Sequence, residues 1–191
     1  MPENKVEFGL RNVHYATYTD NAGVITFDTP IRIPGGVSLT TEPRGELTEF
    51  YADDMLYYTA ENNDGYDGTL TIAKVPEQFA VDALGEELDE VDKVLNEYSD
   101  ATGKPFALLF EFDGDLKATR HILYNCKASR PGDSSNTKTN TREPNTKELK
   151  LIASPIVMDG KRRVKTKTTP STPDTVYNAW YTTVYKKTPQ A

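Results

Sequence analysis

The strongest constraint on the fold is a long succession of short runs rich in Val, Ile, Thr, Tyr and Phe, separated by Gly, Pro, Asn and Asp. Runs of this kind are typical of β-strands joined by turns. In residues 36–42 and 69–75 apolar and polar side chains alternate, which predicts strands with one face in a core and the other toward water or a polar partner. In the first run we expect Val37 and Leu39 to face the core. The chain is therefore predicted to be mainly β.

Other segments extend this pattern. Residues 6–19 predict a first strand, interrupted at Gly9, and residues 24–27 are expected to pair back with it as a hairpin. Residues 105–112 are apolar on both faces, which predicts a central strand covered on two sides, and further strands are expected at 117–129 and 147–154.

Two segments predict helices. Residues 76–85 begin with Pro76 and end with Gly85, as helix-capping preferences require. From 172 to 187, Thr172 suits an N-cap, and apolar and aromatic side chains including Trp180 then recur at helical spacing. This second stripe either packs on the sheet of its own chain or contacts a neighbouring subunit.

The segment 129–146 contains no aliphatic or aromatic residue and joins two predicted strands. It is therefore predicted to be a long polar hairpin loop. Loops of this length are usually functional or disordered.

Residues suited to catalysis or metal binding are sparse. The two histidines, His14 and His121, have no second His or Cys at metal-ligand spacing, and no nucleophile or phosphate-binding motif occurs. Strand alternation predicts that His121 and the single cysteine, Cys126, point to opposite faces. The cluster at 62–68 lacks calcium-loop spacing and is interpreted as a turn. We expect no catalytic, cofactor-binding or metal site, and no cofactor.

The formal net charge is −7, which disfavours tight nucleic-acid binding by the whole surface. The N-terminus lacks an apolar run of signal-peptide length, and no window has the ~18 apolar residues of a membrane span. A soluble protein made in the cytoplasm is expected.

Five stretches, taken together, resemble a known family: FGLRNVHYA, GVSLTTEPRGELTEFYADDMLYYTAENNDGYDGTLTIA, PFALLFEFDGD, ATRHILYNCKASRP and VYNAW. Their order and spacing are similar to those of the major tail protein, or tail tube protein, of phages with long, flexible, non-contractile tails. Such phages and prophages are common in Gram-positive bacteria. The resemblance runs from about residue 5 to about residue 185.

The resemblance implies a single tail-tube domain over 1–191, a β-sandwich or partly open β-barrel with one flanking α-helix and a short C-terminal helix. It implies stacked hexameric rings that form the tail tube of the virion, the conduit for genome ejection. Expected partners are other copies of the chain, the tape measure protein, and the tail-tip and tail terminator proteins. DNA would pass through the lumen without specific binding, and no membrane is involved. No added immunoglobulin-like domain and no enzymatic activity are expected.

Within this interpretation, aromatic side chains around residue 50 seal subunit joints, and acids face the lumen or the next ring. The alternative is that these aromatics are ordinary core and surface residues. The loop at 129–146 is either an arm between subunits or rings, or a disordered hairpin tip. The candidate subunit-contact or lumen residues are Glu49, Phe50, Tyr51, Asp53, Asp54, Tyr57, Tyr58, Asp64, Arg130, Lys138, Arg142 and Trp180.

A second class of function is a monomeric β-sandwich binding module. Tyr57, Tyr58, Tyr66 and Trp180 would then form a stacking platform for a carbohydrate or a peptide. An enzyme would need polar residues gathered from distant strands.

Overall fold

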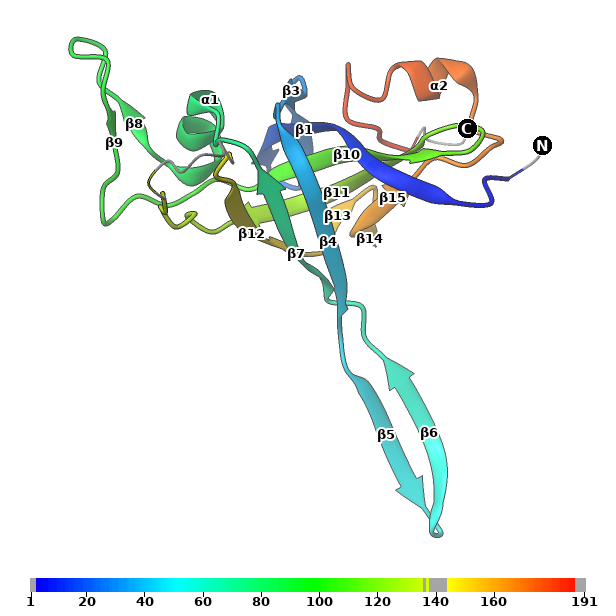
Figure 1. Cartoon of the computed structure of the whole chain (residues 1–191). Helices are drawn as coiled ribbons and strands as arrows, with labels where there is room; N and C mark the ends of the chain where they lie inside the picture. Colours follow the sequence, from blue (N-terminus) through cyan, green and yellow to red (C-terminus); the bar gives the residue numbers. More distant parts are fainter. Residues whose placement is uncertain (1–2, 136, 138–143, 188–191) are drawn as a thin grey trace.

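The computed structural model describes residues 3–135, 137 and 144–187, and most of its elements are strands (Figure 1). The helical elements are α1 (Glu77–Phe79), a π-helical segment η1 (Ala80–Leu84) and α2 (Asp174–Asn178). The strands are β1 (Glu7–Asn21), β2 (Val24–Phe27), β3 (Ile31–Arg32), β4 (Gly36–Arg44), β5 (Leu47–Ala52), β6 (Met55–Glu61), β7 (Gly65–Ile72), β8 (Glu87–Leu88), β9 (Leu95–Asn96), β10 (Phe106–Gly114), β11 (Thr119–Ala128), β12 (Lys147–Ala153), β13 (Ile156–Met158), β14 (Lys161–Arg163) and β15 (Lys165–Lys167).

Nine strands form one curled sheet in the order β2-β1-β10-β11-β12-β7-β4, with β3 added beside β1 and β15 beside β11. The curl brings the start of β4 back toward β1, where a Cβ placed on Gly36 would lie 3.1 Å from Val13 Cγ2. Across the described residues no hydrogen-bonded ladder joins β1 to β4, so the sheet does not close into a barrel. The mainly-β, sandwich-like prediction is confirmed.

Strand β10 lies between two hydrophobic clusters, as predicted for residues 105–112. Phe106, Leu108 and Phe110 pack into the cluster inside the curled sheet. Ala107 and Leu109 pack into the second cluster, beneath β2, β13 and the C-terminal segment. A strand with an apolar residue at nearly every position can cover two cores at once.

The predicted helix at 76–85 is confirmed in its position and its ends. Pro76 is the N-cap of α1, and Gly85 follows η1 with φ of 83°, a left-handed conformation that glycine adopts without strain. Phe79 and Leu84 are buried against the cluster inside the curled sheet.

The predicted helix across 172–187 is wrong in extent. Helix α2 covers Asp174–Asn178, its N-cap is Pro173, and the chain continues in turns. The amides of Trp180 and Thr182 each bond to a carbonyl three residues earlier. These tighter turns still bury Trp180 and Val184, so the apolar stripe reflects burial and not a continuous helix.

Two β-bulges interrupt the predicted alternation of side chains between the two faces of a strand. A register shift between Gly36 and Ser38 leaves Val37 exposed, although it was expected in the core. A second shift in β11, between its pairings with Leu108 and Phe106, inserts an extra residue. His121 and Cys126 therefore lie toward the same cluster, and the prediction of opposite faces is wrong.

Candidate self-association surfaces

The segment that contains most of the candidate residues is a two-stranded hairpin that projects away from the body (Figure 1). We call Leu47–Glu61, which is β5, β6 and their turn, the arm. Its aromatic side chains are exposed, and Tyr57 is 75% exposed. This exposure excludes a place in the core, and it is compatible both with subunit contacts and with ordinary surface aromatics. The exposed large apolar and aromatic side chains of the arm are Leu47, Phe50, Tyr51, Met55, Leu56, Tyr57 and Tyr58.

Cross-strand register shows that both faces of the arm carry such side chains. Phe50 pairs with Tyr58, and Tyr51 pairs with Leu56 across a register shift. Phe50 and Tyr51 are neighbours on β5, so their side chains face opposite sides of the hairpin. An isolated two-stranded hairpin is marginally stable in water. Exposed apolar patches are typical of interaction surfaces, which makes the arm a candidate for one.

The root of the arm is fixed to the body by a close backbone approach. A Cβ placed on Gly45 would lie 1.8 Å from the carbonyl oxygen of Asn62, so this position accepts no larger residue without displacement. The Asp64 amide donates to the Arg44 carbonyl at 2.8 Å. The Arg44 guanidinium donates to the Asp64 carbonyl at 3.0 Å and to Ser154 Oγ at 3.4 Å. Asp64 thus anchors the arm through its backbone.

The tip of the arm is formed by Asp53 and Asp54, with φ values of 50° and 57°. Positive φ at both central residues is the conformation of a type I′ hairpin turn, in which Asp is tolerated. Asp53 and Asp54 form the turn between β5 and β6, while Glu49 accepts a hydrogen bond from the Tyr51 hydroxyl at 2.8 Å. The tip therefore presents two acids beside an aromatic surface.

The outer face of β4, β7 and β12 is a second candidate surface. The inner face of these strands buries Leu70, Ile72, Leu149 and Leu151. The outer face is exposed or half-buried and mostly polar, and Arg44 pairs there with Asp67 at 3.6 Å. Cross-strand neighbours on this face are Ser38, Thr71 and Glu148; Thr40, Thr69 and Lys150; and Glu42, Asp67 and Ile152.

The polar loop at 129–146 connects β11 to β12, as predicted, and its described part is tied to the body. Arg130 pairs with Glu97, and Lys147 pairs with Asp133. Lys138 and Arg142 lie outside the described residues.

Trp180 belongs to the interior of its own chain. It is 2% exposed, stacks on Tyr185 at 5.7 Å between ring centroids, and its indole N–H donates to the His121 carbonyl at 3.5 Å. This agrees with the intramolecular interpretation of the stripe. Tyr66 is half-buried, with the Lys165 ammonium 5.2 Å above its ring. The stacking platform proposed for a binding module is therefore not assembled, because Tyr57 and Tyr58 lie on the arm.

A buried polar network holds the C-terminal segment on the sheet, and no motif in the sequence predicted it. Glu111 is 5% exposed and accepts from Arg120 Nε at 3.0 Å, from Asn12 Nδ2 at 2.7 Å and from the Tyr181 hydroxyl at 3.1 Å. Burial, followed by the Glu111 charge, raises the pKa of Tyr181. His14 stacks on Tyr181 at 4.5 Å. The contacts are all internal, so the network is structural.

The histidines and the cysteine occupy packed positions. His121 stacks on Phe110 at 5.1 Å, and neither of its ring nitrogens has a hydrogen-bond partner among the described residues. Burial, reinforced by Lys165, lowers the pKa of His121 to about 4. Burial raises the pKa of the Cys126 thiol to about 12, which makes it a poor nucleophile. The described residues contain no group of three or more His, Cys, Asp or Glu placed to hold a metal.

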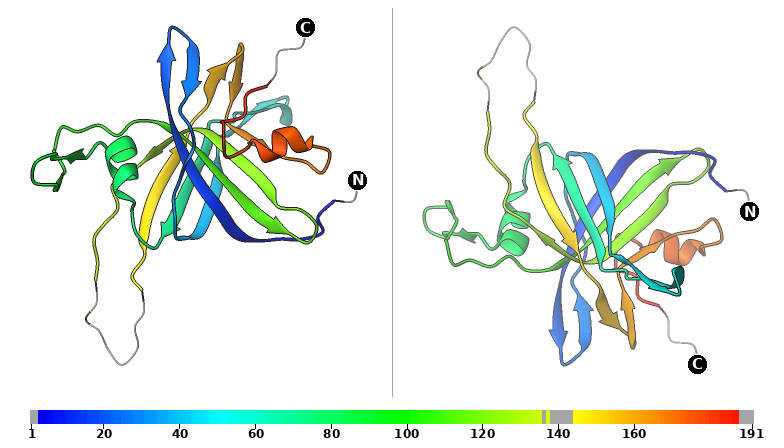
Figure 2. Two further views of the ribbon diagram at one scale, coloured as in Figure 1. Left: turned by 90° about the horizontal axis from the view of Figure 1, so that it is seen from above. Right: turned by 90° about the horizontal axis from the view of Figure 1, so that it is seen from below.

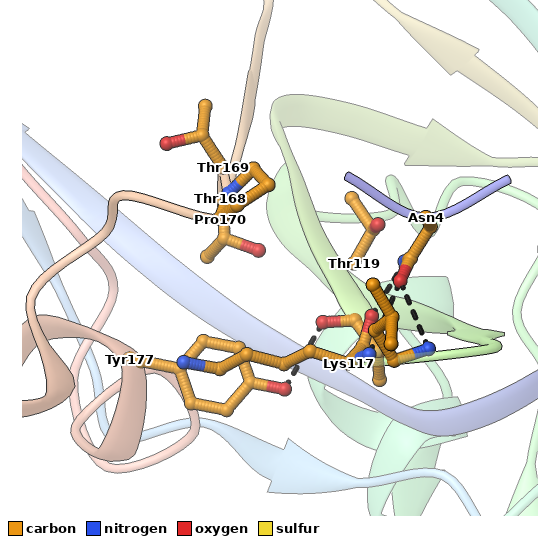
Figure 3. A pocket seen from close by; sticks show the side chains of 9 residues that line it. Asn4, Lys117, Thr119, Thr168, Thr169, Pro170 and Tyr177 are labelled. Atoms are coloured by element: carbon orange, nitrogen blue, oxygen red, sulfur yellow. Dashed lines mark hydrogen bonds between the residues drawn. The ribbon is translucent and has the colours of Figure 1, made fainter. Parts of the chain in front are cut away.

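A pocket of about 250 Å³ lies between the N-terminal segment, the β10–β11 turn and α2 (Figure 3). Asn4 donates to the Lys117 carbonyl at 2.6 Å and accepts from the Lys117 amide at 3.1 Å. The Tyr177 hydroxyl donates to the Ala118 carbonyl at 3.0 Å. These hydrogen bonds join three segments of the chain, so the residues that form them stabilise the fold.

No family model matches the chain. No curated protein matches it. Among solved structures, a cryo-EM structure of the anti-feeding prophage cap, the AFP tube terminating cap, is similar with a TM-score of 0.48 and 9% identity over 83% of this chain and 88% of that chain. A 6-fold symmetrised cryo-EM structure of the anti-feeding prophage baseplate is similar with a TM-score of 0.46 and 10% identity over 88% of this chain and 97% of that chain. No helix in the described residues is long and apolar enough to cross a membrane.

Proposed function

We propose that this protein is a structural subunit of a phage tail, without enzymatic activity, that self-assembles into hexameric rings stacked as the tail tube of the virion. The observation that carries the proposal is the arm, a projecting hairpin with aromatic side chains exposed on both faces. In an isolated chain this surface is unfavourable in water, and contact with other copies would remove it from water.

The arm is suited to reach a neighbouring copy. It extends well beyond the body (Figure 1), and it makes its contacts to the body at the root, around Arg44 and Asp64. Identical subunits that each insert an arm into the next copy make heterologous contacts, which close into rings or continue as filaments. Ring formation and ring stacking each need such a contact.

The polar outer face of β4, β7 and β12 is suited to line a channel. The buried apolar residues of these strands lie on the opposite face, and the outer face is mostly polar, so it can stay in contact with water in the assembly. On the outer face the acids Glu42, Asp67 and Glu148 outnumber the cations Arg44 and Lys150. Negative charge on a channel wall repels phosphate, so DNA would pass without binding.

The free edge of β4 is a further joint in this proposal. Beyond its start, β4 is paired on one side by β7, and the described residues form no ladder on its other side. An unpaired edge is prone to pairing with another chain, and closure of a ring would cover it. The tape measure, tail-tip and tail terminator proteins would then be partners of the assembled tube.

The proposal is tested by sedimentation velocity of the full chain over a concentration series. Wild-type protein is expected to form rings or longer polymers. Phe50→Ser with Tyr58→Ser should remain monomeric, because the arm loses its paired aromatics. Phe8→Ser is the matched control, since Phe8 is an exposed aromatic on β1, away from the arm. Equal association of the arm variant and the wild type would overturn the role of the arm.

The binding-module alternative predicts a different outcome. A monomeric wild type that binds a glycan array, and loses that binding in Tyr57→Ser with Tyr58→Ser, would replace the assembly proposal.

A further inference from the structure

Charge is distributed unevenly along this acidic chain. Residues 86–100 contain seven acids and one lysine, whereas residues 161–167 contain five basic residues and no acid. The first segment contains the β8–β9 hairpin, and the second contains β14 and β15, which we call the basic run. The acidic segment of one copy can therefore attract the basic segment of another copy.

The tip of the β8–β9 hairpin is exposed and partly free of internal partners. Asp89 accepts from the amides of Val91 and Asp92, and Glu90 pairs with Lys93, so those two acids serve the turn itself. In the described structure Asp92 in the turn and Glu87 on β8 are exposed and form no ion pair. Val91, between the acids, is 88% exposed.

The basic run carries exposed charges opposite to those of the β8–β9 hairpin. Lys161, Arg162 and Lys167 are exposed, and no ion pair involves them within the described residues. Arg162 pairs across the β13–β14 hairpin with Val157, which is 58% exposed, so a cation lies beside an exposed apolar side chain. An acid next to Val91 and a cation next to Val157 form a complementary pair of surfaces.

The two surfaces do not meet within one chain. The β8–β9 hairpin and the β13–β14 hairpin leave the body in different directions (Figure 2). Their attraction can therefore be satisfied between two copies. The contact joins different patches on the two copies, so it is heterologous and propagates into a ring or a filament.

We infer that the β8–β9 hairpin of one copy docks on the basic run of a second copy. Asp92 and Glu87 of the first copy face Arg162 and Lys161 of the second, and Val91 packs near Val157. The inference rests on the proposed self-assembly and adds a contact independent of the arm. Because the contact is between exposed charges, it weakens as salt screens them.

Charge reversal tests this contact. Glu87→Lys with Asp92→Lys, and separately Lys161→Glu with Arg162→Glu, are each expected to weaken association about tenfold or more. All four substitutions in one chain exchange the charges, and association should recover. Lys5→Glu with Lys187→Glu is the matched control, since it adds the same negative charge at two other exposed lysines. Circular dichroism confirms that each variant is folded.

The readout is sedimentation velocity at low and high salt. Wild-type association should weaken about tenfold or more when the ionic strength rises from about 0.05 M to about 0.5 M. Reversal variants that associate like the wild type would overturn the inference and leave the proposed function standing. A wild type that stays monomeric at every concentration at low salt, with and without tail-tip proteins, would contradict both. Loss of DNA binding without loss of association in Lys161→Glu with Arg162→Glu would assign the basic run to a nucleic acid instead.

Discussion

The carboxylate of Glu111 is buried, although an isolated carboxylate is more stable in water. A carboxylate on a central strand is costly to bury unless it is paired and hydrogen-bonded. Here Arg120, Asn12 and Tyr181 supply three donors, and Arg120 also lies 3.7 Å above the Tyr177 ring. The network joins β1, β10, β11 and the C-terminal segment, so it holds these elements together.

Removing this carboxylate is expected to be strongly destabilising. Glu111→Ala leaves the Arg120 cation largely buried without its partner, and should lower the free energy of unfolding by about 3–5 kcal/mol. Asp113→Ala is the matched control on the same strand, because Asp113 pairs with the exposed Arg11 at 3.0 Å. Its loss should be about 1 kcal/mol or less. Urea denaturation measures both, and equal effects would contradict a buried network.

His121 predicts a dependence of stability on pH. Its pKa is about 4 in the folded protein against a usual value of 6.5, mainly through burial, with Lys165 and Lys167 opposing the proton and Glu7 favouring it. The unfolded chain therefore binds the proton more readily. The contribution of neutral His121 is complete above about pH 6.5 and is lost as the pH falls toward about 4.

The loss is expected to reach up to about 3 kcal/mol. His121→Phe removes the titrating group and keeps an aromatic ring against Phe110. Urea denaturation at pH 7 and pH 4.5 should show a smaller fall in stability for the variant than for the wild type. The same fall in both proteins would mean that other groups account for the acid sensitivity.

At the scale of elements, the arm and the body are expected to differ in local stability. Phe50 and Tyr58 lie on an exposed two-stranded hairpin, whereas Leu109 lies between two hydrophobic clusters. In the monomer, backbone amides of β5 and β6 should exchange about a hundredfold or more faster than those of β10. Hydrogen exchange with mass spectrometry measures this, and assembly should slow exchange in the arm. Protection of the arm equal to that of β10 in the monomer would contradict an unpartnered arm.

The root of the arm depends on Gly45. Gly45→Ala places a methyl group against the Asn62 carbonyl and should displace the arm. We expect reduced association with little change in the stability of the body. Gly132→Ala is the control, since a Cβ there has no neighbour within 4 Å. Sedimentation and urea denaturation separate the two effects, and full association of Gly45→Ala would show that the arm tolerates the displacement.

Hydrophobic patterns and capping predicted the longer strands of the main sheet and the helix at 76–85, because they report local preferences, but the short strands β3, β8, β9, β13, β14 and β15 were not predicted. The strands at 69–75, 105–112 and 147–154 and the helix at 76–85 were found in these ways, within a few residues at their ends. Bulges were not predictable, since one extra residue is invisible in a periodic pattern and depends on the partner strand. The same reason explains the error at Val37. The helix predicted at 172–187 is too long, because the apolar residues there are spaced by their burial and not by a continuous helix.

At the scale of the whole molecule, the sequence suggested candidate contact residues but not their placement. The aromatics near residue 50 were expected at subunit joints, and the structure places them on a hairpin free of the core. The arm projects because of the turn at Asp53 and Asp54 and the close backbone approach at Gly45. Both features depend on how residues pair across the hairpin. The network around Glu111 could not be predicted, because it joins residues separated by up to 99 positions.

The most direct test of self-assembly is electron microscopy of negatively stained wild-type protein across a concentration series, with light scattering for mass. Rings of uniform size with a central hole are expected, and hollow tubes of the same diameter should form as concentration rises or when tail-tip proteins are added. Particles that keep the 21.3 kDa mass of one chain at every concentration, with and without tail-tip proteins, would contradict it.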